Sequence, residues 1–338
     1  MNTPHPRIEH GDTGASRAAR VAGSARGFHL QSPLIRSLPL IVLTAFMPVA
    51  AADPVVELEA VAQGVFVHRG GQHALESPAR ADIANLGVVI GSDCVAVIDT
   101  GGSPAVGLAL RQAIAAITPL PVCWVINTHV HFDHLLGNAA FAATRAEFVG
   151  HTNLAEAVEA SRSFFVEHFA AELGGGGEAA TRIIAPTRLV EDRIELPLGG
   201  RTLLLTAYPV AHSGQDLSVF DPATGTLFLG DLLVVERAPS LDGSLVGWLR
   251  VLEELPGEGV ARIVPGHGPA SVEGPREIER LREYLVSLRD GVRAAIRAGD
   301  TAEAAAPGIA PEEATRWALF QEVHPRNVVR AWVELEWE

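Results

Sequence analysis

The feature that most constrains this chain is a dense cluster of histidines directly after an apolar segment. Residues 122–126 (VCWVI) predict a strand, and the segment THVHFDH (residues 128–134) follows it. Within this segment His129, His131, Asp133 and His134 carry the imidazole and carboxylate groups that suit zinc, and also iron or manganese. Packing alone rarely gathers so many polar groups, because burying them displaces apolar contacts. The segment therefore predicts a metal-binding loop.

Three further candidate ligands follow apolar strands later in the chain. His212 comes after a strand predicted at 202–208, Asp231 after one at 226–229, and His267 after one at 262–264. Glycines adjoin or flank all three, and they let backbone approach a crowded ion closely. Each residue alone is weak evidence, but their shared position at strand ends indicates a second half of the same site. Asp99, also at a predicted strand end, is a candidate to orient a ligand histidine.

The overall pattern of strands and helices predicts an α/β fold. Two strand-rich halves with interspersed helices favour an αββα sandwich, followed by a C-terminal helical extension. The formal charge of −14 argues against nucleic acid as a partner, since phosphate binding requires clustered basic side chains. All 26 Lys and Arg residues are Arg, so no lysine is available as a catalytic base or Schiff-base former.

The amino-terminal region is typical of an exported protein. Residues 37–52 form an apolar run after Arg36, and Ala50 and Ala52 give a small-x-small cleavage pattern before Asp53. We therefore interpret residues 1–52 as a leader and cleavable signal peptide, which places the mature protein in the periplasm. If the signal is cleaved, the protein is not an integral membrane protein; an uncleaved anchor is the alternative.

The cysteine content leaves two interpretations open. Cys94 and Cys123 both lie in apolar runs that read as strands. The favoured interpretation is two buried, reduced side chains, because free cysteine behaves as a small apolar residue. A disulfide between neighbouring strands requires an oxidising compartment.

Taken in chain order, the ligand pattern HxHxDH, His, Asp, His resembles the metallo-β-lactamase superfamily over roughly residues 58–270. The resemblance implies that His129, His131 and His212 hold one metal, that Asp133, His134 and His267 hold the other, and that Asp231 bridges them. True β-lactamases of this fold tend to have Cys or Ser at the bridging position, whereas hydrolases resembling glyoxalase II carry Asp. His68, His73, His151, His168 and His324 lack such a setting and are expected not to be ligands.

A narrower resemblance involves three other segments. Residues 82–87 (DIANLG), 236–249 (ERAPSLDGSLVGWL) and 324–336 (HPRNVVRAWVELE) are similar to the exported quinoprotein relay system zinc metallohydrolases, which are related to SoxH-type proteins. The implied organisation is a metallo-β-lactamase-fold domain at 53–272 and a helical extension packed on it at 273–338. The family is linked to PQQ-dependent alcohol oxidation, which suggests association with a quinoprotein dehydrogenase or cytochrome.

These features together predict a periplasmic dinuclear zinc hydrolase. A metal-bound hydroxide would attack a small-molecule ester, thioester, lactone or related carbonyl substrate, with Asp133 as the ligand that also orients the nucleophile. Two Zn2+ ions are expected, with iron or manganese as alternatives. Two other functions remain open: a β-lactamase, and a metal-bound accessory or redox protein of the quinoprotein system without turnover.

Overall fold

The computed structural model describes residues 54–175 and 179–338 of the chain. The expected leader at 1–52 lies outside the described residues, so the export signal stays a prediction. No helix in the described ranges is both long and apolar enough to cross a membrane.

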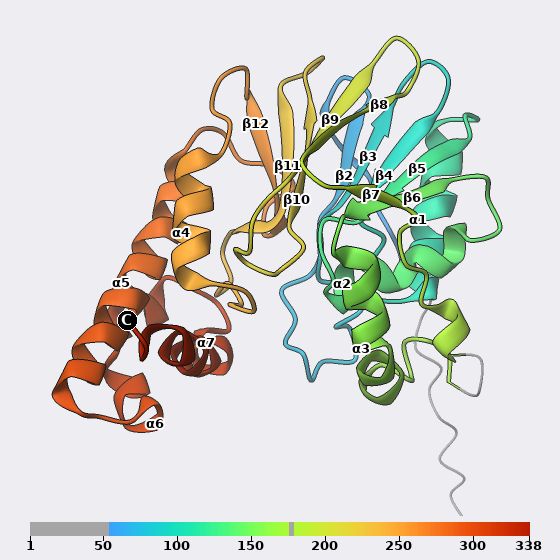
Figure 1. Cartoon of the computed structure of the whole chain (residues 1–338). Coiled ribbons are helices and arrows are strands. Elements are labelled where there is room, and N and C mark those ends of the chain that lie inside the picture. The colour runs from blue at the N-terminus through green and yellow to red at the C-terminus, as the bar shows by residue number, and fades with distance from the viewer. Residues whose placement is uncertain (1–53, 176–178) are drawn as a thin grey trace, which may run out of the picture. The chain divides into compact units, whose positions relative to one another are not determined.

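Two β-sheets form the centre of the fold (Figure 1). The first sheet contains β1 (Glu59–Ala62), β2 (Val65–His68), β3 (Leu86–Ile90), β4 (Val95–Ile98), β5 (Val122–Ile126), β6 (Glu147–His151) and β7 (Arg188–Val190), in that spatial order. Its strands are antiparallel from β1 to β4 and parallel from β4 to β7. The second sheet contains β8 (Arg193–Pro197), β9 (Thr202–Ala207), β10 (Leu217–Asp221), β11 (Thr226–Val234) and β12 (Arg262–His267), in the spatial order β12-β11-β10-β9-β8. The β11 and β12 pair is parallel and the rest of this sheet is antiparallel.

Helices cover the outer faces of both sheets. They are α1 (Pro104–Ile117), α2 (Phe132–Leu135), α3 (Leu154–His168), α4 (Leu245–Glu254), α5 (Arg276–Ala298), α6 (Ala302–Ala305) and α7 (Phe320–Leu335), with four short 3-10 segments between them. Figure 1 shows α1 outside the first sheet and α4 and α5 outside the second. The expected αββα sandwich with a C-terminal helical extension is therefore confirmed.

Three apolar clusters match the three interfaces of such a sandwich. One joins α1 to the first sheet through Val106 and Leu110, and a second fills the space between the sheets with residues such as Val67 and Leu205. The third joins the second sheet to α4, α5 and α7, with Trp248 fully buried within it. Each sheet is thus buried on both faces, as its near-continuous apolar strands require.

The C-terminal helices are tied to the main fold by polar contacts as well. Glu334 of α7 accepts hydrogen bonds from Ser244 Oγ and Leu245 N, both at 2.6 Å, at the beginning of α4. A carboxylate suits this position because the first backbone N–H groups of a helix have no internal partner and carry partial positive charge. The boundary between domain and extension at residue 272 stays a prediction.

The histidine motif itself is partly helical, because α2 begins at Phe132 and a 3-10 segment then covers 136–141.

The favoured expectation for the two cysteines was wrong. Cys94 and Cys123 form a disulfide, with a Cα–Cα distance of 5.8 Å, instead of the favoured pair of reduced thiols. Their pairing follows from the topology, since Cys94 directly precedes β4 and Cys123 lies in the adjacent strand β5.

Candidate metal centre

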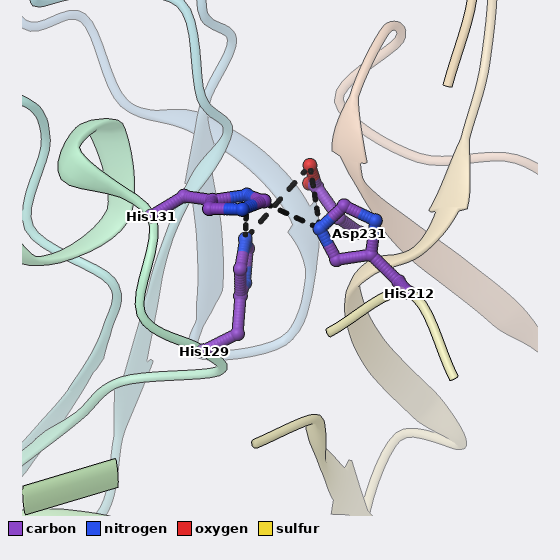
Figure 2. A group of neighbouring side chains, drawn as sticks. All are labelled: His129, His131, His212 and Asp231. Atoms are coloured by element: carbon purple, nitrogen blue, oxygen red, sulfur yellow. Dashed lines mark hydrogen bonds and ion pairs between the residues drawn. The ribbon is translucent and has the colours of Figure 1, made fainter. Parts of the chain in front are cut away.

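Four of the expected ligands converge from separate parts of the chain. His129 and His131 lie between β5 and α2, His212 between β9 and β10, and Asp231 within β11. Figure 2 shows their side chains pointing toward one another from opposite sides. The distance from His131 Nδ1 is 2.9 Å to His129 Nε2 and 3.2 Å to His212 Nε2, and the candidate ligand atoms of all four lie within 4.8 Å of one another.

A second group adjoins the first. Asp133 and His134 lie in α2, and His267 ends β12. The distance from Asp133 Oδ2 is 3.6 Å to His134 Nε2 and 3.4 Å to His267 Nε2. Asp231 also faces this group, because its Oδ1 lies 3.3 Å from His134 Nε2 and its Oδ2 lies 3.2 Å from His267 Nε2. The Asp231 carboxylate therefore stands between the two groups.

Two glycines permit this close approach. A Cβ at Gly266 would lie 2.0 Å from Asp231 Oδ1, and a Cβ at Gly230 would lie 2.6 Å from the Thr128 side chain. Gly230 also has a φ of 52°, which residues with side chains rarely adopt. Larger residues at either position would push β11 and β12 away from the histidine loop.

Asp99 orients two of the histidines through one carboxylate. Its Oδ2 accepts hydrogen bonds from His134 Nδ1 and from Thr128 Oγ1, both at 2.8 Å. Because the Thr128 hydroxyl donates to Asp99, its oxygen is left to accept from His129 Nδ1 at 3.0 Å. With Nδ1 protonated in both rings, the Nε2 lone pairs of His129 and His134 face the cluster.

Backbone carbonyls orient two more rings in the same way. His212 Nδ1 donates to Ser240 O and His267 Nδ1 donates to Ile83 O, each at 2.8 Å. Both rings are buried and present Nε2 to the cluster.

His131 is turned the opposite way, with Nδ1 facing the cluster. Its Nε2 lies 3.1 Å from Asp242 Oδ2, so Nε2 carries the proton and Nδ1 keeps its lone pair. Burial opposes ionisation of Asp242, but the hydrogen bond and charge of His131, together with His212 and Ser240, outweigh it and lower the pKa of that carboxyl. Nothing in the pattern of the sequence singles out Asp242, because its role depends on a loop that the fold brings over His131.

The electrostatics of the cluster favour a cation. Burial lowers the pKa of His129 and of His212, which keeps these imidazoles neutral and able to ligate. Burial opposes protonation of His134 too, but the Asp133, Asp99 and Asp231 carboxylates raise its pKa well above the usual range. The three carboxylates around His134 thus provide enough negative charge to stabilise a buried cation.

The donor set fits two divalent ions. His134 Nε2 and Asp231 Oδ1 are fully buried and lack a hydrogen-bond partner of acceptable geometry within the described ranges. Buried polar atoms of this kind normally have a partner, and a metal ion would supply it. Neutral imidazoles and carboxylates are the ligands that zinc, iron and manganese share. The identity of the ion does not follow from these donors.

The structure brings all seven expected ligands together in the expected two groups. Their ligation of metal, and the catalytic role of Asp133, stay predictions. The five histidines expected not to be ligands lie outside both groups. His68, for example, pairs with Asp82 at 2.8 Å, and His151 contacts Tyr208 O at 3.2 Å.

The centre lies at a cavity of about 880 Å³. His131, Asp133, Asp231 and His267 contribute to its lining, and α3 and α7 supply much of the rest. The lining is mostly apolar, as in many small-molecule sites.

Comparison with known proteins agrees with this arrangement. The family model described as "Metallo-beta-lactamase superfamily" matches residues 79–267, which contain all seven candidate ligands. The chain belongs to the metallo-beta-lactamase superfamily. Superfamily membership, together with the candidate dimetal ligand groups, makes it a metal-dependent hydrolase. No curated protein matches the sequence.

Solved structures of metallo-beta-lactamase-fold proteins share the architecture. A beta-lactamase domain protein from Burkholderia ambifaria has a TM-score of 0.61 and 19% identity, covering 85% of this chain and 89% of its own. The inverting sec-alkylsulfatase Pisa1 from Pseudomonas sp. has a TM-score of 0.60 and 15% identity, covering 83% of this chain and 50% of its own. A metallo-beta-lactamase from Pontibacter korlensis has a TM-score of 0.53 and 20% identity, covering 68% and 99%. At these identities the likeness establishes the fold alone.

Proposed function

We propose that this protein is an exported dinuclear hydrolase that cleaves an ester, thioester, lactone or related carbonyl compound. The observation that carries the proposal is the position of the Asp231 carboxylate between the two ligand groups. Asp231 belongs to the first group, and its oxygens lie 3.3 Å from His134 Nε2 and 3.2 Å from His267 Nε2 of the second group. A carboxylate shared in this way, at the edge of a large cavity, suits two ions acting on one substrate.

Two bound divalent ions would lower the pKa of water toward neutrality and polarise the substrate carbonyl. The residues of this chain hold the reacting groups in place. Asp133 Oδ2 faces His134 and His267, and the same residue lines the cavity, where its carboxylate can accept a hydrogen bond from the attacking water. Asp99, Asp242 and the two carbonyls fix the rings, so little reorganisation is needed at the moment of reaction.

Metal analysis tests this proposal most directly. Protein made with zinc, iron and manganese offered together should contain roughly two equivalents of metal, and Asp231→Ala should lose roughly one of them. Asp300→Ala, which changes an exposed acid after α5, is the matched control and should keep both. Unchanged occupancy in Asp231→Ala would contradict the shared carboxylate.

A substrate panel separates the candidate functions. Metal-loaded protein would be offered aryl esters, S-lactoylglutathione, lactones and nitrocefin. Hydrolysis of any aryl ester, S-lactoylglutathione or a lactone supports the proposal. Turnover of nitrocefin alone would instead identify a β-lactamase, against the expectation from an Asp at position 231. No turnover of any compound by fully loaded protein would favour the accessory role.

Export and association with a quinoprotein system are also proposals. Export is supported by the apolar run at 37–52 and by the Cys94–Cys123 disulfide, since such bonds persist mainly in oxidising compartments. Cell fractionation of a C-terminally tagged chain should place it in the periplasm, shortened by the leader. Association is supported by the three segments that resemble the quinoprotein relay family, and co-purification with a periplasmic dehydrogenase or cytochrome tests it.

A further inference from the structure

One arginine at the cavity differs from the other arginines there. The side chain of Arg237 lines the same cavity as Asp133, Asp231 and His267, yet the residue is only 7% exposed. Its Nη1 is fully buried without a hydrogen-bond partner, and no carboxylate pairs with its guanidinium within residues 54–175 and 179–338. A buried, unpaired cation is costly, and an anionic ligand in the cavity would offset that cost.

The backbone around Arg237 is fixed on both sides. Glu236 O accepts from Ala318 N and Ala238 N donates to Ala318 O, both at 2.8 Å. Glu236 itself has a φ of 69°, a left-handed conformation that non-glycine residues adopt rarely. Its side chain pairs with Arg69 at 2.8 Å, while the next side chain, Arg237, lines the cavity. Because Arg237 lies between two residues with fixed backbones, one of them strained, the fold specifies the direction of its side chain.

The other arginines of the cavity do not share this state. Arg80 is occupied by Glu172 at 2.6 Å and by the carbonyls of Leu75 and His168. Arg330 donates to Asp242 O at 2.6 Å, and Arg326 is exposed. Arg237 is therefore the buried guanidinium of this cavity whose donors remain available to a ligand.

The rest of the wall is suited to an apolar body. Phe132 and Phe169 stack with a centroid distance of 4.1 Å, and Leu241, Val323 and Val333 lie on the same cavity. A compound that fills this space can bury its apolar part there while an acid group reaches Arg237. A guanidinium binds carboxylates through two parallel N–H donors, which fixes orientation as well as affinity.

We infer that Arg237 is the anion-recognition residue of the substrate site, so that the substrate is an amphipathic acid: an apolar acyl compound that carries a carboxylate or similar anion away from the bond that is cleaved. The choice of reaction rests on the proposed hydrolase function. Binding of the anion does not depend on turnover, and the two can be tested apart.

Binding is measured first, on the full metal-free chain. Isothermal titration compares anilides of succinic, glutaric and adipic acids, which keep one free carboxylate, with butyranilide, valeranilide and hexananilide, which do not. At least one acid should bind about tenfold or more tightly than its neutral partner, as expected for hydrogen bonds to a charged group. Arg237→Met should remove that preference, Arg237→Lys should retain part of it, and Arg326→Met, the control on the same cavity, should keep it.

Kinetics on the metal-loaded protein then uses the corresponding p-nitrophenyl esters. Arg237→Met should lower kcat/KM for the preferred acidic ester about ten- to hundredfold and leave the neutral ester within about twofold. Arg237→Lys gives a folded comparison if the Met variant is unstable. A wild-type chain that binds neutral anilides as well as acidic ones, or an acid preference that survives Arg237→Met, overturns the inference. If the acid preference stands while no ester is hydrolysed, the proposed function fails and the anion site remains.

Discussion

A comparison of two buried polar networks among the described residues, both built around histidines, shows one difference between them. In the C-terminal extension both ring nitrogens of His324 are used, because Nε2 contacts Ile309 O at 2.9 Å and Nδ1 contacts Tyr284 OH at 3.0 Å. Asn327 completes that network by donating to Tyr284 OH at 2.8 Å. In the metal centre each ring has one nitrogen fixed by a protein acceptor and the other turned toward the cluster.

This difference separates structural histidines from ligand histidines better than burial does. His324 and His134 are both almost fully buried, and both lie in polar surroundings. Only His134 leaves a buried nitrogen without a good hydrogen-bond partner within the described ranges. The His324 network is therefore complete without a ligand, whereas the candidate metal centre is expected to need an ion to complete it.

Metal removal should give the largest effect. Where free metal exceeds its dissociation constant a thousandfold, chelation should lower the free energy of unfolding by about 4 kcal/mol. Urea unfolding with and without chelator measures this. Equal stability in both conditions would mean that the centre, like the extension, is complete without an ion.

Asp99→Asn should weaken metal binding about ten- to hundredfold. Asparagine tolerates the left-handed φ of 59° at this position, but its amide has a single acceptor oxygen. It therefore cannot accept from Thr128 N on one side and from His134 Nδ1 on the other, as the two carboxylate oxygens do. Competition with a chromogenic chelator measures the affinity. Asp221→Asn, which breaks a buried pair with Arg201 away from the seven ligands, is the control and should leave metal affinity unchanged.

Asn327→Ala should destabilise the chain by about 1–3 kcal/mol, because Leu241 N, Pro239 O and Tyr284 OH lose a buried partner. Metal content should stay at the wild-type value. Val329→Ala, an exposed position on the same helix, should have little effect on stability. Loss of metal in Asn327→Ala with stability preserved would reverse the assignment of the two networks.

A smaller effect should follow from pH. Burial lowers the pKa of His324, so as pH falls below about 6.5 the unfolded chain takes up a proton that the folded chain resists. Stability should therefore fall with acid, by at most about 1.4 kcal/mol per pH unit for this group. The free energy of unfolding is measured against pH for metal-free wild type and metal-free His324→Gln. The difference between the two slopes gives the contribution of His324. Identical slopes would show that His324 does not contribute.

The grouping of the seven candidate ligands could be predicted from the sequence, because four of them fall within six residues and the other three lie at or near apolar strands. Their partners were harder to predict. Asp99 could be proposed because it lies at the end of a predicted strand. Asp242 and Arg237 lie in a loop whose path depends on contacts with residues 318–334, so their positions could not be predicted from the sequence. The disulfide depended on which strands are neighbours, and the short strands β1 and β7 have too few residues to show a period.

The hold of α7 on the loop at 239–246 has an evolutionary consequence. Three side chains of α7 form hydrogen bonds with that loop: those of Asn327, Arg330 and Glu334. The helix itself supplies none of the seven candidate ligands. The same loop contains Ser240 and Asp242, which orient His212 and His131. Mutations in this tail can therefore alter both the wall of the cavity and the orientation of two candidate ligands, so the tail and the centre are expected to evolve jointly.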